Sequence, residues 1–173
     1  MIPPAIKVFL EIELLFPSFL PSLFPNYFSM DSIGILGAGA MGRGIAQVAA
    51  AAGHPVILCD NLTMALSKSN KAIQDSLKRT VEKGKLSDAE AYSAFSRIKF
   101  TDHMSHFREC SLVIEAIVED IEQKQIAFRS MEAVVGEETI LASNTSSLSI
   151  SAMGAQMKKP ERVLGIHFFN PVP

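Results

Sequence analysis

Two features of this sequence could do chemistry. The first is a histidine, His167, in the apolar segment GIHFFNPVP (165–173). Its imidazole is the side chain best suited to exchange a proton near neutral pH. The second is the segment GAGAMG (37–42), in which Gly37, Gly39 and Gly42 have the G-x-G-x-x-G spacing of a diphosphate-binding turn. From the residues alone, a hydrogen-bonded structural histidine is an equally good interpretation of His167.

The surroundings of the glycine segment indicate a dinucleotide site. Gly37 permits a tight turn, Gly39 lets a diphosphate approach the backbone, and Gly42 lets a helix pack closely against the preceding strand. The segment follows a predicted strand and opens a predicted helix, and Asp60 comes 18 residues after Gly42, at the end of the second strand. A carboxylate there would accept hydrogen bonds from the adenosine ribose. A glycine-rich turn without a dinucleotide is the alternative.

Asp60 also bears on the choice of cofactor. A carboxylate accepts hydrogen bonds from a free 2′-hydroxyl and repels a 2′-phosphate. The residues that follow it, 61–67, contain no Arg or Lys that could bind such a phosphate. We therefore expect the chain to prefer NAD to NADP.

Short apolar runs alternate with helical patterns along most of the chain. Continuous apolar runs are typical of strands that are buried on both faces. The runs that we interpret as strands are 32–36, 55–59, 97–100, 112–117, 139–143 and 162–168. Apolar residues with helical periodicity lie between them, over 41–52, 62–81 and 121–135. This alternation predicts a Rossmann-type, doubly wound α/β fold, with a mostly parallel sheet and helices on both faces.

Composition excludes some classes of function. The formal net charge of the 173 residues is −2, so no basic field is available to bind nucleic acid. Cys59 and Cys110 are far apart and lack the spacing of metal ligands, which favours a reducing compartment and argues against a zinc site. We expect a cytoplasmic protein without a metal.

The first thirty residues differ from the rest. They are apolar, but Pro17, Pro21 and Pro25 recur every four residues, and each removes a helical hydrogen bond. Glu11 also interrupts the run, so no membrane-spanning helix is expected. We interpret 1–29 as a non-globular extension ahead of a Rossmann domain over 30–173, with Met30 as the natural start. A weak membrane-surface anchor is the alternative.

Four segments carry a resemblance to a known family. They are ILGAGAMGRGIAQ (35–47), LVIEAIVEDIEQK (112–124), ILASNTSSLSI (140–150) and LGIHFFNPVP (164–173). In this order and spacing they resemble the 3-hydroxyacyl-CoA dehydrogenase family, including the 3-hydroxybutyryl-CoA dehydrogenases, over residues 31–173. The resemblance implies NAD-dependent oxidation of an (S)-3-hydroxyacyl-CoA to a 3-ketoacyl-CoA, in fatty-acid metabolism such as β-oxidation. A non-catalytic NAD-binding module and a Rossmann dehydrogenase of a free 3-hydroxyacid are the alternatives.

The resemblance also implies roles for individual residues. His167 would take the hydroxyl proton as hydride leaves the same carbon. Ser146 would contact the substrate oxygen and the nicotinamide region, although a serine here could instead cap a helix that begins near Leu148. The other residues implied to line the cofactor are Met41, Ile117, Val118, Glu119, Lys124, Asn144 and Asn170. Core packing, a solvated helix start and turns are the alternatives for them.

Ser76 and Lys83 would hold coenzyme A on the same resemblance. They lie seven residues apart, two turns along one predicted helix, and the ammonium could meet a phosphate of the CoA nucleotide. A charge on an exposed helix is more often only solvated.

The sequence departs from the family at its end. Full-length relatives continue with a helical domain that supplies a glutamate orienting the catalytic histidine, a further substrate-binding asparagine and most of a dimer interface. None of these parts follows Pro173. We therefore expect a fragment or a truncated gene product that binds NAD but turns over slowly or not at all alone, with Phe168 and Phe169 exposed.

Overall fold

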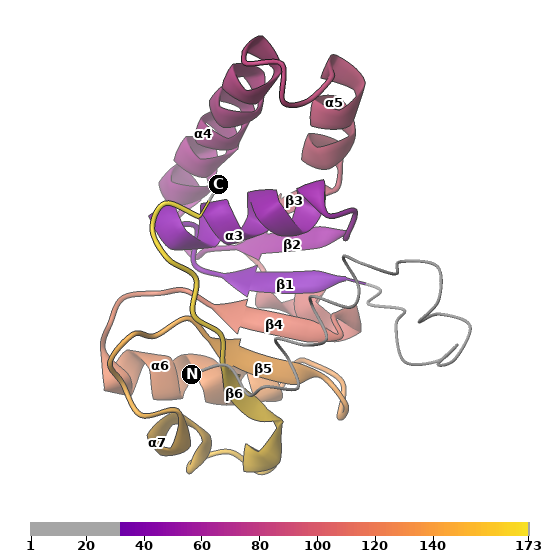
Figure 1. Ribbon diagram of the computed structural model, residues 1–173. Helices are drawn as coiled ribbons and strands as arrows, with labels where there is room; N and C mark the ends of the chain where they lie inside the picture. Colours follow the sequence, from indigo (N-terminus) through magenta and orange to yellow (C-terminus); the bar gives the residue numbers. More distant parts are fainter. Residues whose placement is uncertain (1–31, 173) are drawn as a thin grey trace, which may run out of the picture. The chain divides into compact units, whose positions relative to one another are not determined.

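Six short strands form one sheet in the computed structural model, which describes residues 32–172. The strands are β1 (Ile33–Leu36), β2 (Val56–Cys59), β3 (Ile98–Thr101), β4 (Leu112–Glu115), β5 (Ile140–Ser143) and β6 (Val163–Gly165). Their order is β3-β2-β1-β4-β5-β6, and every neighbouring pair is parallel (Figure 1). A strand forms at each of the six predicted places, although β6 ends earlier than predicted, and the predicted extension over 1–29 lies outside the described residues.

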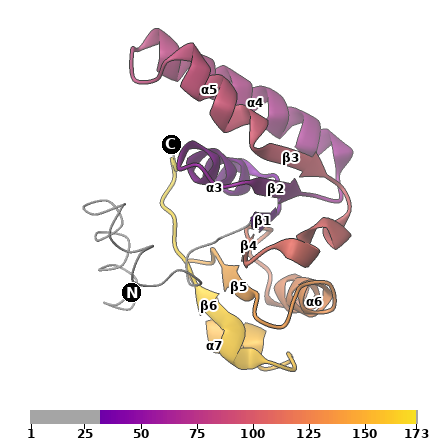
Figure 2. The same cartoon turned by 90° about the vertical axis from the view of Figure 1, so that its right-hand side faces the viewer.

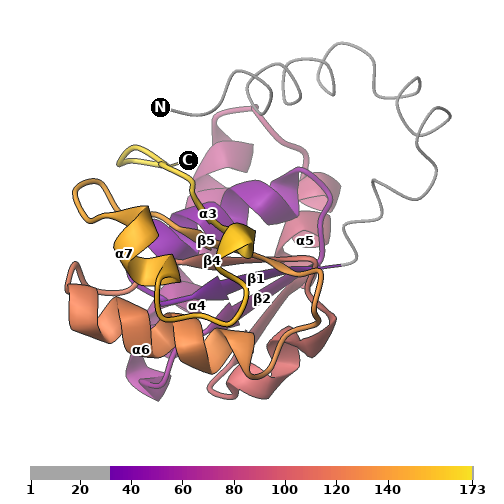
Figure 3. The ribbon, with the colours of Figure 1, turned by 90° about the horizontal axis from the view of Figure 1, so that it is seen from below.

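Helices cover both faces of this sheet, as predicted. α3 (Ala40–Ala51) lies on one face of the sheet, and α4 (Thr63–Glu82) and α5 (Asp88–Ser96) pack against α3. α6 (Ile121–Glu132) lies on the opposite face (Figure 2). α7 (Ile150–Gly154) lies next to α6 (Figure 3). The helical periodicities predict α3, α4 and α6. They do not predict α5 or two short 3-10 helices, η1 (Met104–Glu109) and η2 (Pro160–Arg162).

A capping box is the sequence signal that marks the start of α5. The Ser87 hydroxyl accepts a hydrogen bond from the Glu90 N–H (3.2 Å), and the Glu90 carboxylate accepts one from the Ser87 N–H (2.8 Å). The segment SDAE (87–90) has the S-x-x-E pattern that satisfies both N–H groups at a helix start. Of this helix only Ala94 is buried, so no apolar periodicity accompanies the cap.

Alternate residues of each strand face the two helical layers. One buried cluster joins strand residues to α6: Leu36, Val113, Leu141, Phe128 and Met131. Ile35 faces the other way, toward Gly42 at the start of α3. Because side chains alternate along a strand, the last residues of β4 and β5, Glu115 and Ser143, also face α6.

The strand predicted over 162–168 is wrong at its carboxyl end. β6 stops at Gly165, so His167 lies two residues beyond it. The Ile166 N–H still donates to the Ser143 carbonyl (3.0 Å), but β5 ends at Ser143. An edge strand cannot continue where its one neighbour has ended, and His167 therefore lies in the segment after the strand.

An ion pair attaches the segment before β6 to α6. Arg162 Nη2 lies 3.3 Å from Glu132 Oε1, and the two side chains are 10% and 11% exposed. Glu132 also accepts hydrogen bonds from the backbone N–H groups of Lys158 and Lys159, each 3.0 Å long. Arg162 Nη1 donates to the Gly136 carbonyl (2.7 Å). These contacts fix the chain that leads into β6 and on to His167.

Replacing Glu132 by glutamine is expected to lower the free energy of unfolding by about 1–2 kcal/mol at neutral pH. Desolvation raises the pKa of the Glu132 carboxyl, but the bonds from Lys158, Lys159 and Arg162 outweigh it and hold this pKa below its ordinary value. A group with a depressed folded-state pKa stabilises the fold above its unfolded pKa, and this contribution disappears as pH falls through the folded pKa. The melting temperatures of the two proteins should therefore converge as the pH falls through the depressed folded-state pKa of Glu132. A difference that persists at acidic pH would contradict the prediction.

Candidate functional site

The carboxyl ends of the strands meet in one row. The register pairs Leu36 of β1 with Cys59 of β2 and with Glu115 of β4, and Glu115 pairs with Ser143 of β5. All four residues are the last of their strands. The strand order reverses between β1 and β4, and open parallel sheets bind ligands outside their carboxyl ends at such a point. The candidate site is therefore built by the loops that follow this row.

The glycine turn after β1 leaves room for a bound group against its backbone. Gly37 has φ +105°, which favours glycine, and its N–H donates to the Cys59 carbonyl (2.8 Å). A Cβ on Gly42 would lie 1.8 Å from the Gly37 carbonyl oxygen, so the first turn of α3 packs directly on the glycine turn. A Cβ on Gly39 would meet nothing within 4 Å. This open space beside a helix N-terminus fits a diphosphate.

Asp60 is bonded to the glycine turn. Its carboxylate accepts hydrogen bonds from the Ala38 N–H (2.7 Å) and the Leu62 N–H (2.9 Å). The Ala38 carbonyl accepts a hydrogen bond from the hydroxyl of Ser69, a buried residue of α4. The N–H and the carbonyl of Ala38 are therefore both hydrogen-bonded. Asp60 stabilises the glycine turn and is also partly exposed to solvent. The sequence patterns predict neither this contact nor the part played by Ser69.

Asp60 lines a cavity of about 640 Å³, which we call the adenosine-side cavity. Its lining also includes Gly37, Gly39, Asp102, Val118 and Ile126. Burial, with smaller contributions from Asp60 and Asp102, raises the pKa of the Cys59 thiol to about 11. The thiol of Cys59, which also lines this cavity, is therefore neutral near neutral pH.

A second cavity, of about 500 Å³, adjoins the first and is called the His167 cavity. Both cavities are lined by Ala116 and Ile117, in the loop after β4. Eight residues implied by the family resemblance line the His167 cavity: Met41, Ile117, Glu119, Lys124, Asn144, Ser146, His167 and Asn170. The fold thus brings together residues from α3, α6 and the segments after β4, β5 and β6. Val118 lines the adenosine-side cavity instead.

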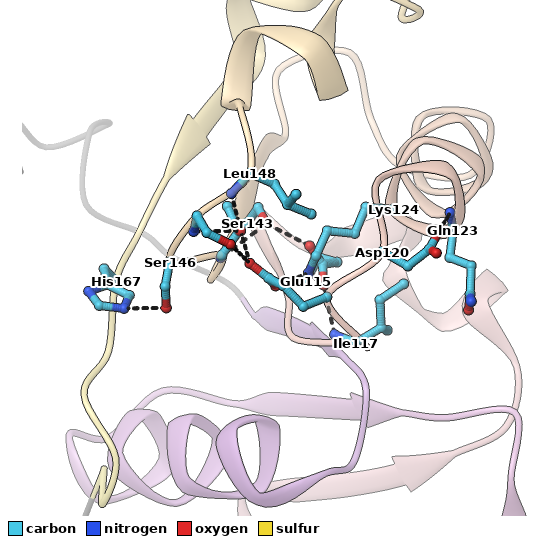
Figure 4. A network of polar contacts seen from close by, with 12 residues as sticks. Glu115, Ile117, Asp120, Gln123, Lys124, Ser143, Ser146, Leu148 and His167 are labelled. Atoms are coloured by element: carbon cyan, nitrogen blue, oxygen red, sulfur yellow. Dashed lines mark hydrogen bonds and ion pairs between the residues drawn. The ribbon is translucent and has the colours of Figure 1, made fainter.

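Ser146 and His167 contact each other in the His167 cavity (Figure 4). Ser146 Oγ lies 2.9 Å from His167 Nε2. The imidazole also meets the Phe169 ring edge-on, with ring centroids 4.6 Å apart. Asn144 Oδ1 accepts a hydrogen bond from the Phe168 N–H (2.8 Å), which ties the loop after β5 to the histidine segment. These contacts can hold an imidazole and a hydroxyl toward one substrate oxygen.

The interpretation of Ser146 as a helix cap is wrong. Ser149 is the N-cap of α7, and its hydroxyl accepts a hydrogen bond from the Ala152 N–H (3.2 Å). The Leu148 N–H donates to the hydroxyl of Thr145 (3.0 Å) rather than to Ser146. Three neighbouring hydroxyl residues therefore have different tasks, and the choice among them depends on the path of the loop.

The two aromatic residues after His167 differ in exposure. Phe169 is 77% exposed, as expected from the sequence. Phe168 is only half-buried and lines the His167 cavity, so the expectation that both rings are exposed holds fully for Phe169 alone.

A polar network behind the His167 cavity is not predicted by the sequence patterns. Glu115 is fully buried and accepts hydrogen bonds from Lys124 Nζ (2.6 Å), Ser143 Oγ (2.6 Å) and the Ile117 N–H (2.7 Å) (Figure 4). Lys124 is 1% exposed and also lies 3.4 Å from a carboxylate oxygen of Glu119. The sequence signal for this network is Glu115 itself, a carboxylate inside the otherwise apolar strand β4. An unpaired buried charge is costly, so a buried carboxylate indicates partners nearby.

Glu119 continues this network to the rim of the cavity. Desolvation raises the pKa of its carboxyl, but hydrogen bonds from Thr145 and Ser147 and the nearby Lys124 ammonium outweigh it and hold the pKa below its ordinary value. The Ser147 hydroxyl donates to Glu119 Oε1 (3.1 Å), as does the hydroxyl of Thr145. The ionised carboxylate thus connects the loop after β4 with the loop after β5.

The two residues expected to hold coenzyme A lie outside both cavities. Ser76 is half-buried on α4, and Lys83 is exposed immediately after the last residue of that helix. Neither lines the adenosine-side cavity or the His167 cavity. The structure therefore does not bring them together with Ser146.

The parallel sheet order, the glycine turn and Asp60 define a Rossmann-type dinucleotide-binding domain. The model of the family described as "3-hydroxyacyl-CoA dehydrogenase, NAD binding domain" matches residues 32–173. The chain belongs to this family, and its cofactor is NAD.

Known proteins of similar sequence and structure carry related names. The chain is 44% identical over 140 residues to a probable 3-hydroxybutyryl-CoA dehydrogenase of Deinococcus radiodurans, covering 81% of this chain and 50% of that protein. It is 43% identical over 145 residues to the mitochondrial hydroxyacyl-coenzyme A dehydrogenase of Rattus norvegicus, covering 80% and 46%. The crystal structure of (S)-3-hydroxybutyryl-CoA dehydrogenase from Ralstonia eutropha superposes with a TM-score of 0.82 at 40% identity, covering 84% of this chain and 51% of that one. The chain thus spans about half the length of the relatives it matches.

Residues 32–172 contain neither a membrane-spanning helix nor a cluster of metal-binding side chains. None of the helices in this range is long and apolar enough to cross a membrane. The same residues contain no group of three or more His, Cys, Asp or Glu side chains that could hold a metal ion.

Proposed function

We propose that this chain is the dinucleotide-binding part of an NAD-dependent enzyme that oxidises an (S)-3-hydroxyacyl-CoA to a 3-ketoacyl-CoA. The observation that carries the proposal is the contact of Ser146 with His167 in a cavity that adjoins the adenosine-side cavity. The names of the relatives support a substrate similar to 3-hydroxybutyryl-CoA.

The proposed reaction gives each polar side chain a task. NAD, when bound, supplies a hydride acceptor. The His167 imidazole takes the proton of the substrate 3-hydroxyl, and the Ser146 hydroxyl donates a hydrogen bond to the same oxygen as it becomes a ketone. The residues proposed to line the cofactor are Gly37, Gly39, Met41, Gly42, Asp60, Ile117, Val118, Glu119, Lys124, Asn144, Ser146 and Asn170.

Oxidation of NADH by acetoacetyl-CoA tests this reaction in the reverse direction. We expect only slow turnover of the thioester, because the chain spans about half the length of its relatives, and a still lower rate with free acetoacetate. Equal rates would favour a dehydrogenase of a free 3-hydroxyacid. NADH binding without any turnover of the thioester, even when the remaining half of a full-length relative is fused to the chain, would favour a non-catalytic NAD-binding module.

Coenzyme A is proposed to contact Ser76 and Lys83 on the outside of α4. Replacing Lys83 by alanine is expected to raise the KM for acetoacetyl-CoA roughly two- to fivefold with kcat unchanged, because an exposed ammonium–phosphate contact is weak. Lys78→Ala, which replaces an exposed lysine within α4, is the matched control. A KM that does not respond to Lys83→Ala would remove this residue from the substrate site.

NADPH is expected to bind at least about tenfold more weakly than NADH, because Asp60 repels a 2′-phosphate. The described residues that line the adenosine-side cavity include two acids, Asp60 and Asp102, and no Arg or Lys. Titration of the chain with each reduced coenzyme, followed by nicotinamide fluorescence, gives the two dissociation constants. NADPH binding as tight as that of NADH would disprove the selectivity.

We place the proposed reaction in fatty-acid or butanoate-type metabolism in the cytoplasm. The thiols of Cys59 and Cys110 support a reducing compartment, since both are free and buried. We further propose one domain over 30–173 preceded by an extension over 1–29. The single sheet formed within 32–172 supports this division.

A further inference from the structure

Glu115 is bonded to three separate parts of the chain at once. Its carboxylate accepts hydrogen bonds from the Ile117 N–H in the loop after β4, from Lys124 on α6, and from Ser143 at the end of β5. The Glu115 backbone carbonyl also accepts a hydrogen bond from the Asn144 N–H (2.9 Å). Ile117, Lys124 and Asn144 all line the His167 cavity. Glu115 itself is fully buried and does not line it.

The environment of Lys124 makes this arrangement sensitive to Glu115. The side chain of Lys124 is 1% exposed, and an ammonium without solvent needs a close counter-charge. Glu115 lies 2.6 Å from it, whereas Glu119 lies 3.4 Å away with a side chain that is 43% exposed. Glu115 is therefore the principal partner of this ammonium.

We infer that Glu115 is a positioning residue for the nicotinamide half of the cofactor site. It sets the place of the Lys124 ammonium and of the loops after β4 and β5, against which that half of the dinucleotide binds. This inference rests on the proposed function. Glu115 adds to the proposed function a residue that does not line the cofactor site but on which the residues lining that site depend.

The location of the three donors argues against a general stabilising role. Glu132, at the other end of α6, is a comparable carboxylate: it accepts two backbone N–H bonds and pairs with Arg162. Its partners lie away from both cavities. Glu115 instead holds residues of the His167 cavity, so its loss should affect ligands that reach this cavity more than ligands that do not.

The test compares NADH with ADP, which contains the adenosine and the diphosphate but no nicotinamide. In Glu115→Gln we expect the Kd for NADH to rise roughly tenfold, because Lys124 and Ser143 lose a charged acceptor. The Kd for ADP should change less than about twofold, because Asp60 and the glycine turn are untouched. Ser143→Ala is a milder variant that keeps the ion pair. It should give a smaller shift of the same kind, and it serves if the glutamine variant does not fold.

Glu132→Gln is the matched control, since it removes a mostly buried, hydrogen-bonded carboxylate whose partners line neither cavity. It should lower the melting temperature and leave both dissociation constants as in the wild type. Equal weakening of NADH and ADP in Glu115→Gln and Ser143→Ala, or NADH binding unchanged in both, would overturn the positioning role. Failure of the wild type to turn over acetoacetyl-CoA even when fused to the remaining half of a full-length relative would refute the proposed function, whereas a selective loss of NADH binding in Glu115→Gln would still support the role of Glu115.

Discussion

Replacing His167 by alanine is expected to slow the acetoacetyl-CoA-dependent oxidation of NADH by roughly 10²- to 10⁴-fold. In this direction the imidazole would donate the proton that the ketone oxygen needs as hydride arrives. Ser146 Oγ lies 2.9 Å from His167 Nε2 and remains in the variant, but a serine hydroxyl is a poor acid and a poor base near neutral pH. The cavity would therefore keep a hydrogen-bond donor and lose its proton-transfer group.

The cofactor should bind to the His167 variant almost as it binds to the wild type. The glycine turn and Asp60 lie on the other side of Ile117, so the Kd for NADH should change less than about threefold. His54→Ala, which replaces a histidine in the loop between α3 and β2, is the matched control and should retain the wild-type rate. A full rate in the His167 variant would falsify the assignment of this imidazole as the acid–base group.

Replacing Gly42 by alanine is expected to weaken NADH binding by more than roughly 100-fold and to destabilise the fold by about 1–3 kcal/mol. The added Cβ would lie 1.8 Å from the Gly37 carbonyl oxygen and 3.0 Å from its carbonyl carbon. Both atoms belong to the backbone, so no side chain can rotate away. The turn or the start of α3 must move, and both form the proposed surface for the diphosphate.

Gly39→Ala separates the two effects of Gly42→Ala. Its Cβ would point into open space, so the melting temperature should stay close to that of the wild type. The methyl group would nevertheless occupy room proposed for the diphosphate, and NADH affinity should fall. Gly136→Ala is the control outside the site, where the nearest contact of the new Cβ is an ordinary 3.5 Å. Tight NADH binding by Gly39→Ala would show that the diphosphate lies elsewhere.

The strands were predictable because each is a short, continuous apolar run. β1, β2 and β4 lie inside the sheet with their side chains mostly buried, so their apolar runs locate them closely, as does that of β5, of which only Ile140 is exposed. β3 lies at one edge of the sheet, and its exposed Lys99 interrupts the apolar run without hiding it. β6 is an edge strand, and its end depends on where β5 ends rather than on its own residues. The apolar run therefore extends past Gly165 into the segment that carries His167.

The candidate site was predictable where a motif determines the local backbone. The glycine turn and Asp60 lie where their spacing indicates, and eight residues implied by the resemblance line one cavity. The sequence patterns do not predict the role of Glu115, because its partners Lys124 and Ser143 are nine and 28 residues away and meet it only through the sheet register and the packing of α6. Ser69 was missed for the same reason, since its bond to Ala38 crosses from α4 to the turn.

The bond between the Asp60 carboxylate and the Ala38 amide constrains any attempt to re-engineer this domain for the phosphorylated coenzyme. Replacing Asp60 by a neutral residue would remove its repulsion of the 2′-phosphate. The same replacement would remove the hydrogen bond that holds the Ala38 N–H in the glycine turn, so both coenzymes would bind more weakly. A better redesign keeps that acid and adds a guanidinium nearby. Leu62, which is 63% exposed and lines the same cavity, is the position from which an arginine could reach the extra phosphate.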